Sequence, residues 1–203
     1  MIRLYDFDLS GNAYKVRNLL SLLGVAHERV TVNLLAGAQR TPDFLALNPF
    51  GQVPVLVDGD VVVRDSSAIL VYLGRKFGGG EWLPVDAEGE ARVQEWLATA
   101  STVVADGPAQ ARLIELFGAE GDIEAARERA HAVLAKFEAH LEHTPFLAGA
   151  RPTIADVANH AYITLAPDGG VALAAYPHVR AWIERLAKLP GFEPAPVRPA
   201  AAS

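Results

Sequence analysis

The sequence of 203 residues contains no cysteine, and this absence excludes several kinds of chemistry. A chain without thiols forms no disulfide, offers no thiolate ligand to a metal ion and has no sulfur nucleophile of its own. Redox reactions that pass through a protein cysteine are excluded for the same reason. Any sulfur that reacts in this protein must be brought by a ligand.

Long apolar runs and basic clusters are also missing. No segment reaches the roughly 18 apolar residues of a membrane helix, and Asp6 and Asp8 interrupt the N-terminus where a signal peptide would be apolar. The 24 acidic residues outnumber the 18 basic ones, which gives a net charge of -6 and disfavours nucleic acid as a partner. We therefore expect a cytoplasmic protein that binds neither a membrane nor nucleic acid.

The histidines do not suggest a metal site. They show no His-x-x-x-His spacing and no shared set of acidic neighbours, which are the usual signs of a metal-binding cluster. We therefore predict that no metal is bound. The six positions are His27, His131, His140, His143, His160 and His178.

What the sequence does contain is enough apolar surface for folded domains. It is 51% hydrophobic and 21% charged, and its length suits one or two domains of about 100 residues. A glycine- and proline-rich linker at 78–87 separates a mixed first domain, 1–77, from a second domain, 88–192, in which helix follows helix. The tail at 193–203 is rich in proline and alanine, so we predict that it is disordered.

The sequence of the first domain predicts that its strands and helices follow the order β-α-β-α-β-β-α. Val16, Leu19, Leu20 and Leu23 recur with helical spacing, and the Asp58-Gly59 pair favours a hairpin turn. A parallel βαβ start followed by an antiparallel hairpin is the thioredoxin-like arrangement. The expected strands cover 1–5, 30–34, 53–57 and 61–63, and the expected helices follow the caps near 10, 41 and 65.

The second domain predicts a bundle of helices. Apolar residues share one helical face over 93–104 and another over 123–141. Thr153 and Asp156 fit a capping box that begins a helix running into Tyr162. A last helix around Trp182 ends at Pro190-Gly191. The expected fold class is therefore α/β followed by all-α.

Four short motifs occur in order within this framework. They are Ser10-Gly11-Asn12-Ala13-Tyr14-Lys15-Val16-Arg17, Asn48-Pro49-Phe50-Gly51-Gln52-Val53-Pro54, Arg64-Asp65-Ser66-Ser67-Ala68-Ile69, and Phe146-Leu147-Ala148-Gly149 followed by Thr153-Ile154-Ala155-Asp156. With these motifs the chain, from residue 1 to about 192, resembles the cytosolic glutathione S-transferases of the serine type, as a zeta-, theta- or delta-like bacterial member. The zeta class has cysteine where this chain has Asn12.

The resemblance implies a transferase that joins the thiolate of glutathione to small, largely apolar electrophiles. Glutathione would be a substrate, and no separate cofactor would be needed. Homologues are homodimers, and the segments 68–72 and 93–100 would be the natural contact surface. Two other functions stay open: reduction or isomerisation with glutathione, and a non-catalytic glutathione-binding or interaction module.

Ser10 is the residue that the resemblance identifies as the activator of the thiol. A thiol with a pKa near 8.5 is only about 3% thiolate at pH 7, so the anion needs stabilisation. A hydroxyl hydrogen bond to the sulfur contributes about 1.5–3 kcal/mol. Ser10 could instead be only a helix cap, and the Asn12 amide is a competing donor. Tyr5 is one residue away from the position that tyrosine-type classes use, so we expect it to pack in the core.

The other motifs indicate how glutathione would be held. The Val53–Pro54 bond is expected to be cis, with the Val53 backbone pairing with the extended tripeptide. Asp65 would pair with the γ-glutamyl ammonium, and Ser66 with the neighbouring carboxylate. Both residues could also serve only as helix caps. Most family members have Glu or Gln where this chain has Asp65.

Further candidates are less specific. Gln39, Gln52 and, more weakly, Arg40 are expected near the glycyl carboxylate. The second-substrate pocket is expected between the domains, along the first long helix of the bundle, where Arg112 could face a leaving group or remain a solvated charge. Asp156 is expected to be structural. The expected lining residues are Trp96, Ser101, Val104, Gln110 and Arg112.

Overall fold

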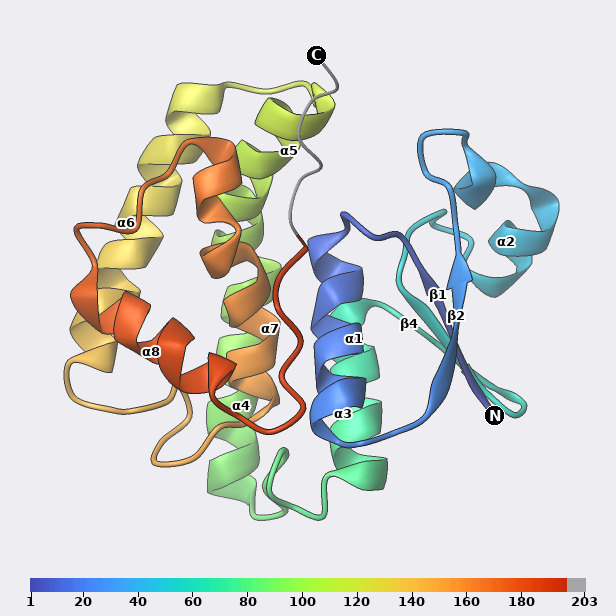
Figure 1. Cartoon of the computed structure of the whole chain (residues 1–203), viewed down its shortest axis with the longest axis horizontal. Coiled ribbons are helices and arrows are strands. Elements are labelled where there is room, and N and C mark those ends of the chain that lie inside the picture. The colour runs from blue at the N-terminus through green and yellow to red at the C-terminus, as the bar shows by residue number, and fades with distance from the viewer. Residues whose placement is uncertain (197–203) are drawn as a thin grey trace.

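The computed structural model describes residues 1–196, so residues 197–203 of the predicted tail lie outside the described part (Figure 1). A four-stranded sheet has the order β2-β1-β3-β4. Strand β1 pairs in parallel with β2 and antiparallel with β3, and β3 pairs antiparallel with β4. The strands are β1 (Ile2–Asp6), β2 (His27–Thr31), β3 (Val55–Asp58) and β4 (Val61–Arg64).

The helices of the first domain follow the predicted order. Helix α1 buries Val16, Leu19 and Leu20 of the predicted apolar stripe, whereas its fourth member, Leu23, is the partly buried C-cap of the helix. Gly59, with a φ of 61°, makes the turn between β3 and β4. The thioredoxin-like β-α-β-α-β-β-α prediction is confirmed. The helices are α1 (Gly11–Leu22), the short 3-10 helix η1 (Ala38–Arg40), α2 (Pro42–Leu47) and α3 (Ser66–Phe77).

The rest of the described chain is helical, as predicted. One irregularity is a π-helical segment, η2, which contains Gly107 and Pro108 and joins α4 to α5. No described helix has both the length and the apolar character needed to cross a membrane. The elements are α4 (Ala87–Ser101), η2 (Ala105–Ala109), α5 (Gln110–Phe117), α6 (Ile123–Leu141), α7 (Ile154–Thr164), the 3-10 helix η3 (Ala166–Gly169) and α8 (Pro177–Ala187).

The two domains share one continuous apolar core, which includes Leu4 and Val16 of the first and Leu97 and Ile163 of the second. Helices α1 and α3 lie between the sheet and the helical domain, and α7 packs against α1 and α4 (Figure 1). The capping box of Thr153 and Asp156 begins α7, as predicted. This arrangement places the N-terminal end of α1 at the junction of the domains.

The segment after α8 runs back along α1 (Figure 1). The Glu193 N–H donates to Asn18 Oδ1 at 3.0 Å, and the Tyr14 hydroxyl donates to the Glu193 carbonyl at 2.7 Å. Phe192 packs edge-on against His160. The start of the predicted tail is therefore held against the two helices that join the domains.

Candidate active site

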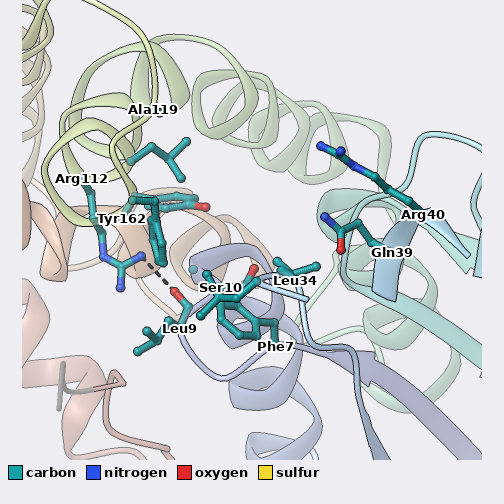
Figure 2. Close-up of a pocket in the computed structure, with 13 residues that line it drawn as sticks. Phe7, Leu9, Ser10, Leu34, Gln39, Arg40, Arg112, Ala119 and Tyr162 are labelled. Carbon is teal, nitrogen blue, oxygen red and sulfur yellow. Dashed lines mark hydrogen bonds between the residues drawn. The ribbon is translucent and has the colours of Figure 1, made fainter. Parts of the chain in front are cut away.

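A cavity of about 630 Å³ lies at the N-terminal end of α1, between the two domains. One wall is formed by the β1–α1 turn, with Ser10 and Gly11, and by the segment that follows β2. The opposite wall comes from α5 and from Tyr162 of α7. Figure 2 shows Ser10 between these walls, with Gln39 and Arg40 on one side and Arg112 and Tyr162 on the other.

Ser10 is the N-cap of α1. Its Oγ accepts the Ala13 N–H at 3.2 Å, and the helix has no acidic residue in its first turn. A hydroxyl that accepts one hydrogen bond keeps its own hydrogen available for donation. The helix N-terminus adds a partial positive charge at the same place. Capping and sulfur activation are therefore compatible at Ser10.

The turn that precedes Ser10 is held from both domains. Arg17 Nη2 donates to the Asp8 carbonyl at 3.0 Å, and Arg112 Nη1 donates to the Leu9 carbonyl at 2.9 Å. Arg17 is itself fixed by two hydrogen bonds to the buried Asp6 carboxylate, at 2.6 and 2.8 Å. Two consecutive carbonyls thus receive guanidinium donors, and the position of the Ser10 side chain is closely defined.

Arg112 lines the cavity, as expected, but it is not a solvated surface charge. The residue is only 1% exposed, and its Nε donates to Asp168 Oδ2 of η3 at 2.9 Å. Its Nη2 is buried without a hydrogen-bond partner among residues 1–196. The guanidinium therefore links α5, η3 and the turn before Ser10.

The N-termini of α1 and α3 meet beside this turn. The Ser66 hydroxyl is 3.4 Å from Asn12 Oδ1, as a donor to it. Asn12 thus contacts the start of α3, and it is not among the residues that line the cavity. Ser66 is buried at the first position of α3. The two predicted binding motifs, which are more than 50 residues apart in sequence, are neighbours in space.

Asp65 has an unusual backbone conformation. Its φ of 73° makes it the one non-glycine residue of the described chain with a positive φ. Such conformations cost about 1–3 kcal/mol and concentrate at functional sites. Its Oδ1 accepts the N–H groups of Ser67 at 2.8 Å and Ala68 at 3.2 Å, so Asp65 caps α3. The side chain is exposed, and Oδ2 takes no part in the cap.

The Val53–Pro54 peptide bond is cis, as predicted, and both residues are buried directly before β3. Gln52 is exposed, and its carbonyl accepts Asn48 Nδ2 at 2.7 Å. Gln39 lines the cavity with a buried Oε1 that has no partner among the described residues, and Arg40 lies next to it. Tyr5 packs edge-on against Phe44, in agreement with a packing role.

The predicted second-substrate residues other than Arg112 do not line this cavity. Trp96 packs against Phe137 and His140, with ring centroids 5.0 and 4.8 Å away. Val104 is completely buried in the core. Ser101 lies between α3 and α4, with its Oγ 3.3 Å from Ser67 Oγ. Gln110 is not a lining residue either; it contacts the Glu120 carbonyl at 3.4 Å.

Sequence reasoning missed most of the apolar lining. These side chains come from the turn after β1, the segment after β2 and the outer end of α5, and Tyr162 joins them from α7. Leu113 and Phe117 are partly exposed on α5, which is a weak signal that a face is left open for a ligand. The missed residues are Phe7, Leu9, Leu34, Leu35, Leu113, Phe117, Ala119 and Tyr162.

Two buried titratable groups lie on α1 and α7, the helices that pack together beside the cavity. Burial lowers the pKa of Lys15 to about 8, although the charge of Asp65 acts in the opposite direction. Burial also lowers the pKa of His160 to about 3, so this imidazole is neutral at physiological pH. Among residues 1–196, no group of three or more His, Asp or Glu side chains could hold a metal ion.

Comparison with known proteins identifies the same protein family for both domains. The family model for the glutathione S-transferase N-terminal domain matches residues 4–81, and the model for the C-terminal domain matches residues 94–190. Glutathione S-transferase 3 of Zea mays is 38% identical over 95% of this chain and 91% of its own length.

Solved structures of glutathione transferases have the same fold as this chain. A glutathione S-transferase from Pseudomonas fluorescens superimposes with a TM-score of 0.90, at 33% identity, over 95% of this chain and 98% of its own. A glutathione transferase homologue from Drosophila mojavensis, solved with bound glutathione, has a TM-score of 0.85 at 31% identity over 93% and 88% of the two chains. Together with the cis proline, the capped α1 and the cavity between the domains, these matches establish that the chain belongs to the glutathione S-transferase family.

Proposed function

We propose that this chain conjugates the thiolate of glutathione to small, largely apolar electrophiles that bind beside Ser10. The main support is the position of Ser10, which caps α1 and faces a cavity with room for a second molecule. Family membership supports glutathione as the thiol. Glutathione is then a substrate, and we expect no further cofactor.

In this mechanism the Ser10 hydroxyl donates a hydrogen bond to the sulfur and stabilises the thiolate. A hydrogen bond to a charged group contributes about 1.5–3 kcal/mol, and the N-terminus of α1 adds about 0.3–1 kcal/mol. Lowering the thiol pKa by two units requires about 2.7 kcal/mol, which these two contributions together supply. The thiolate then forms the C–S bond, and the leaving group departs with its electron pair.

The tripeptide would lie across the start of α3. Asp65 would accept the γ-glutamyl ammonium through Oδ2, the carboxylate oxygen that does not cap the helix. Ser66 would hold the neighbouring carboxylate through its hydroxyl and its own N–H, because Asp65 already accepts the N–H groups of Ser67 and Ala68. The backbone N–H and C=O of Val53, beside Pro54, would pair with the cysteinyl residue as one strand pairs with another.

The glycyl end would lie near Gln39, Gln52 and Arg40. Gln39 has a half-buried amide at the cavity wall, and Arg40 places a positive charge next to it. Gln52 is exposed just before Val53 and would approach the same carboxylate from the other side. A carboxylate held by one guanidinium and two amides would account for all three side chains.

The second substrate would occupy the apolar part of the cavity. Its walls are Phe7, Leu34 and Leu35 of the first domain and Leu113 and Phe117 of α5. Such a lining favours small apolar or aromatic electrophiles. Arg112 would contribute the positive field of its buried charge at one end. Trp96, Ser101 and Val104 form no part of this pocket.

We further propose that the protein is a cytoplasmic homodimer. The support is a groove between α3 and α4, lined by Ala68, Val71, Leu97 and Ala98, which lie in the segments where family resemblance predicts the contact surface. Sedimentation at several protein concentrations measures the association directly. A monomer at all concentrations would contradict the dimer and leave the activity proposal intact.

The central experiment compares Ser10→Ala with Ser10→Thr. The alanine variant should raise the pKa of the bound thiol by about one to two units, since the lost hydrogen bond contributes about 1.5–3 kcal/mol. Ultraviolet titration of the thiolate measures this shift, and turnover of a chloronitrobenzene should fall about 10- to 100-fold. The threonine variant keeps the hydroxyl and the cap, so most of the activity should remain.

Asn12→Ala is the matched test of the competing donor. Because Asn12 Oδ1 pairs with Ser66, its loss should change turnover only a few-fold. Full activity in Ser10→Ala together with loss in Asn12→Ala would show that the amide is the donor. Rapid reduction of a small disulfide without conjugation would favour the reductase alternative. Glutathione binding without any turnover would favour the non-catalytic module.

A further inference from the structure

Asp168 of η3 is joined to the turn before Ser10 through Arg112. Its Oδ2 accepts a hydrogen bond from Arg112 Nε at 2.9 Å. The same guanidinium donates from Nη1 to the Leu9 carbonyl at 2.9 Å (Figure 2). Asp168 itself is not among the residues that line the cavity. A carboxylate of the helical domain, outside the cavity, is therefore only two hydrogen bonds away from the turn that carries Ser10.

The peptide group between Leu9 and Ser10 is held at both of its polar ends. Its carbonyl accepts from Arg112 Nη1, and its N–H, which belongs to Ser10, donates to the Phe7 carbonyl at 2.9 Å. The orientation of this peptide plane fixes the φ of Ser10, which is -72°, and with it the direction of the side chain. The bond from Arg112 therefore helps to define where the Ser10 hydroxyl lies.

Asp168 lies on a rigid part of the helical domain. The next residue, Gly169, packs so closely on α5 that a Cβ added there would lie 2.7 Å from the Arg112 backbone nitrogen. Arg127 Nε of α6 donates to the Gly169 carbonyl at 2.9 Å, and the Asp168 N–H donates to the Leu165 carbonyl at 3.1 Å. Because η3 is fixed against α5 and α6, the carboxylate has a defined position.

Arg112 depends on this carboxylate for both its charge and its direction. Only 2% of the Arg112 side chain is exposed, and among residues 1–196 Asp168 is the one acid that pairs with it. A buried cation without a counter-charge is costly and turns toward water. A long side chain also has no fixed direction unless its charged end is held. Loss of the carboxylate would therefore release the Leu9 carbonyl.

We propose that Asp168 is a positioning residue, which acts through Arg112 to fix the peptide between Leu9 and Ser10 and thereby the direction in which the Ser10 hydroxyl donates to the glutathione sulfur. This inference rests on the proposed conjugation of glutathione with Ser10 as the activator. It adds a residue of the helical domain, outside the cavity, to those that determine the pKa of the bound thiol. A hydrogen bond weakens steeply when it is misaligned, so a small rotation of this peptide is enough to raise that pKa.

The test is Asp168→Ala, with the bound glutathione thiol titrated by ultraviolet absorbance. The pKa of the thiol should rise by about 0.5–1 unit, which is part of the shift expected for complete loss of the Ser10 hydrogen bond. Turnover of a chloronitrobenzene should fall about 3- to 10-fold at pH 6 and less than about two-fold at pH 9, where the thiol is ionised in both proteins. A purely structural role would lower turnover by the same factor at both pH values.

The KM for glutathione separates positioning from binding. Asp168 makes its side-chain hydrogen bond to Arg112 and to none of the residues proposed to hold the tripeptide. In Asp168→Ala the KM for glutathione should therefore change by less than about two-fold, while kcat at pH 6 carries the loss. A large rise in KM with an unchanged kcat would contradict the positioning role.

A double variant tests whether Asp168 acts through Ser10. Adding Asp168→Ala to Ser10→Ala should not raise the thiol pKa further, because the hydroxyl that Asp168 directs is already absent. Additive shifts, or a shift in Ser10→Ala and none in Asp168→Ala, would overturn this inference and leave the role of Ser10 standing. An unchanged pKa in both single variants would count against Ser10 as the activator, and this inference would fail with it.

Glu115→Ala is the matched control. Glu115 forms another acid–arginine pair of the helical domain, with Arg127 Nη2 at 3.1 Å, and neither residue bonds to the turn before Ser10. Its loss should leave the thiol pKa and the pH dependence of turnover unchanged. A shift as large as that in Asp168→Ala would show that any loosening of the helical domain raises the pKa, and would overturn the specific role of Asp168.

Two further substitutions vary what Asp168 offers to Arg112. Asp168→Asn keeps an acceptor oxygen at the same distance from the backbone, so the thiol pKa should rise less than half as far as in Asp168→Ala. Asp168→Ser covers the case in which the alanine variant does not fold. Its oxygen is one bond nearer to the backbone and does not reach Nε, but a water molecule can solvate the guanidinium. The pKa should rise in this variant too, and an unchanged pKa would contradict the positioning role.

Discussion

Helices α1 and α7 both begin at a hydroxyl side chain that caps the first turn, and their N-termini differ in what surrounds them. At α7, the Asp156 carboxylate accepts the N–H groups of Thr153 and Leu147 and the Trp182 indole N–H, each at 2.9 Å. Asp156 is completely buried. The polar groups at the N-terminus of α7 are therefore satisfied by other groups of the protein.

At α1 the cap is Ser10 alone. Its Oγ makes one hydrogen bond to Ala13, no acid follows in the first turn, and the side chain lies in a cavity wall. The positive end of the helix is left without a protein anion, which favours an anion supplied by a ligand. Similar capping chemistry thus gives a buried, fully hydrogen-bonded helix N-terminus at α7 and a helix N-terminus that faces a cavity at α1.

The largest expected effect comes from removing the carboxylate that accepts hydrogen bonds at the N-terminus of α7. Asp156→Ala removes the acceptor of four buried donors, the three N–H groups and the Thr153 hydroxyl, so the free energy of unfolding should fall by about 3–5 kcal/mol. Urea denaturation measures this loss. The pKa of the bound glutathione thiol should not change in the protein that remains folded. A loss below about 1 kcal/mol would mean that this carboxylate does not hold the domain together.

The converse change adds an acid to the open N-terminus. Ser10→Asp keeps a good N-cap, so the stability should stay within about 0.5–1 kcal/mol of the original. The carboxylate would repel a thiolate and cannot donate to it, so conjugation should fall about 100-fold or more, which corresponds to about 2.7 kcal/mol. Activity assays and urea denaturation on the same sample separate the two effects. Retained activity would refute the anion-binding role of this helix end.

A smaller expected effect is the change in the free energy of unfolding with pH that comes from His160, in the buried interior of α7. His160 is buried, neither ring nitrogen has a partner in the described chain, and burial lowers its pKa to about 3. Between pH 6.5 and 3 the unfolded chain binds this proton and the folded chain does not, so stability should fall as pH falls. The slope from this group is about 1.4 kcal/mol per pH unit.

His160→Leu should remove that part of the slope. Urea denaturation at several pH values between 7 and 4 gives the comparison with the unaltered protein. The two proteins should differ most at the acidic end. If the free energies of unfolding of the two proteins changed in parallel with pH, His160 would be protonated in the folded protein as readily as in the unfolded chain.

Most of the fold was predictable because its signals are local. The stripe from Val16 to Leu23, the Asp58-Gly59 turn and the Thr153–Asp156 box each specify an element through neighbours in the sequence. The glutathione motifs at Ser10 and at Asp65 were recognised for the same reason. The positive φ of Asp65 was not foreseen, because it depends on how β4 meets α3.

The lining of the cavity beside Ser10 was predicted less well, and the π-helical segment at 105–109 is one reason. A π turn inserts an extra residue, so the regular helical spacing read from Val93 to Val104 does not continue into α5. Tyr162 was missed for another reason. Its neighbour, Gly11, is about 150 residues away in the sequence, and only the packing of α7 on α1 brings the two together.

The hydrogen bond from Arg112 to the Leu9 carbonyl has a consequence for how such an enzyme could evolve. In the proposed mechanism the same guanidinium lies in the wall that would select the electrophile and fixes the turn that would activate the nucleophile. Substitutions on α5 or η3 that broaden the range of accepted compounds would therefore also disturb the reactive sulfur. New specificities should arise more easily through substitution of the leucines after β2, because changes there can alter the range of accepted electrophiles without lowering the catalytic rate.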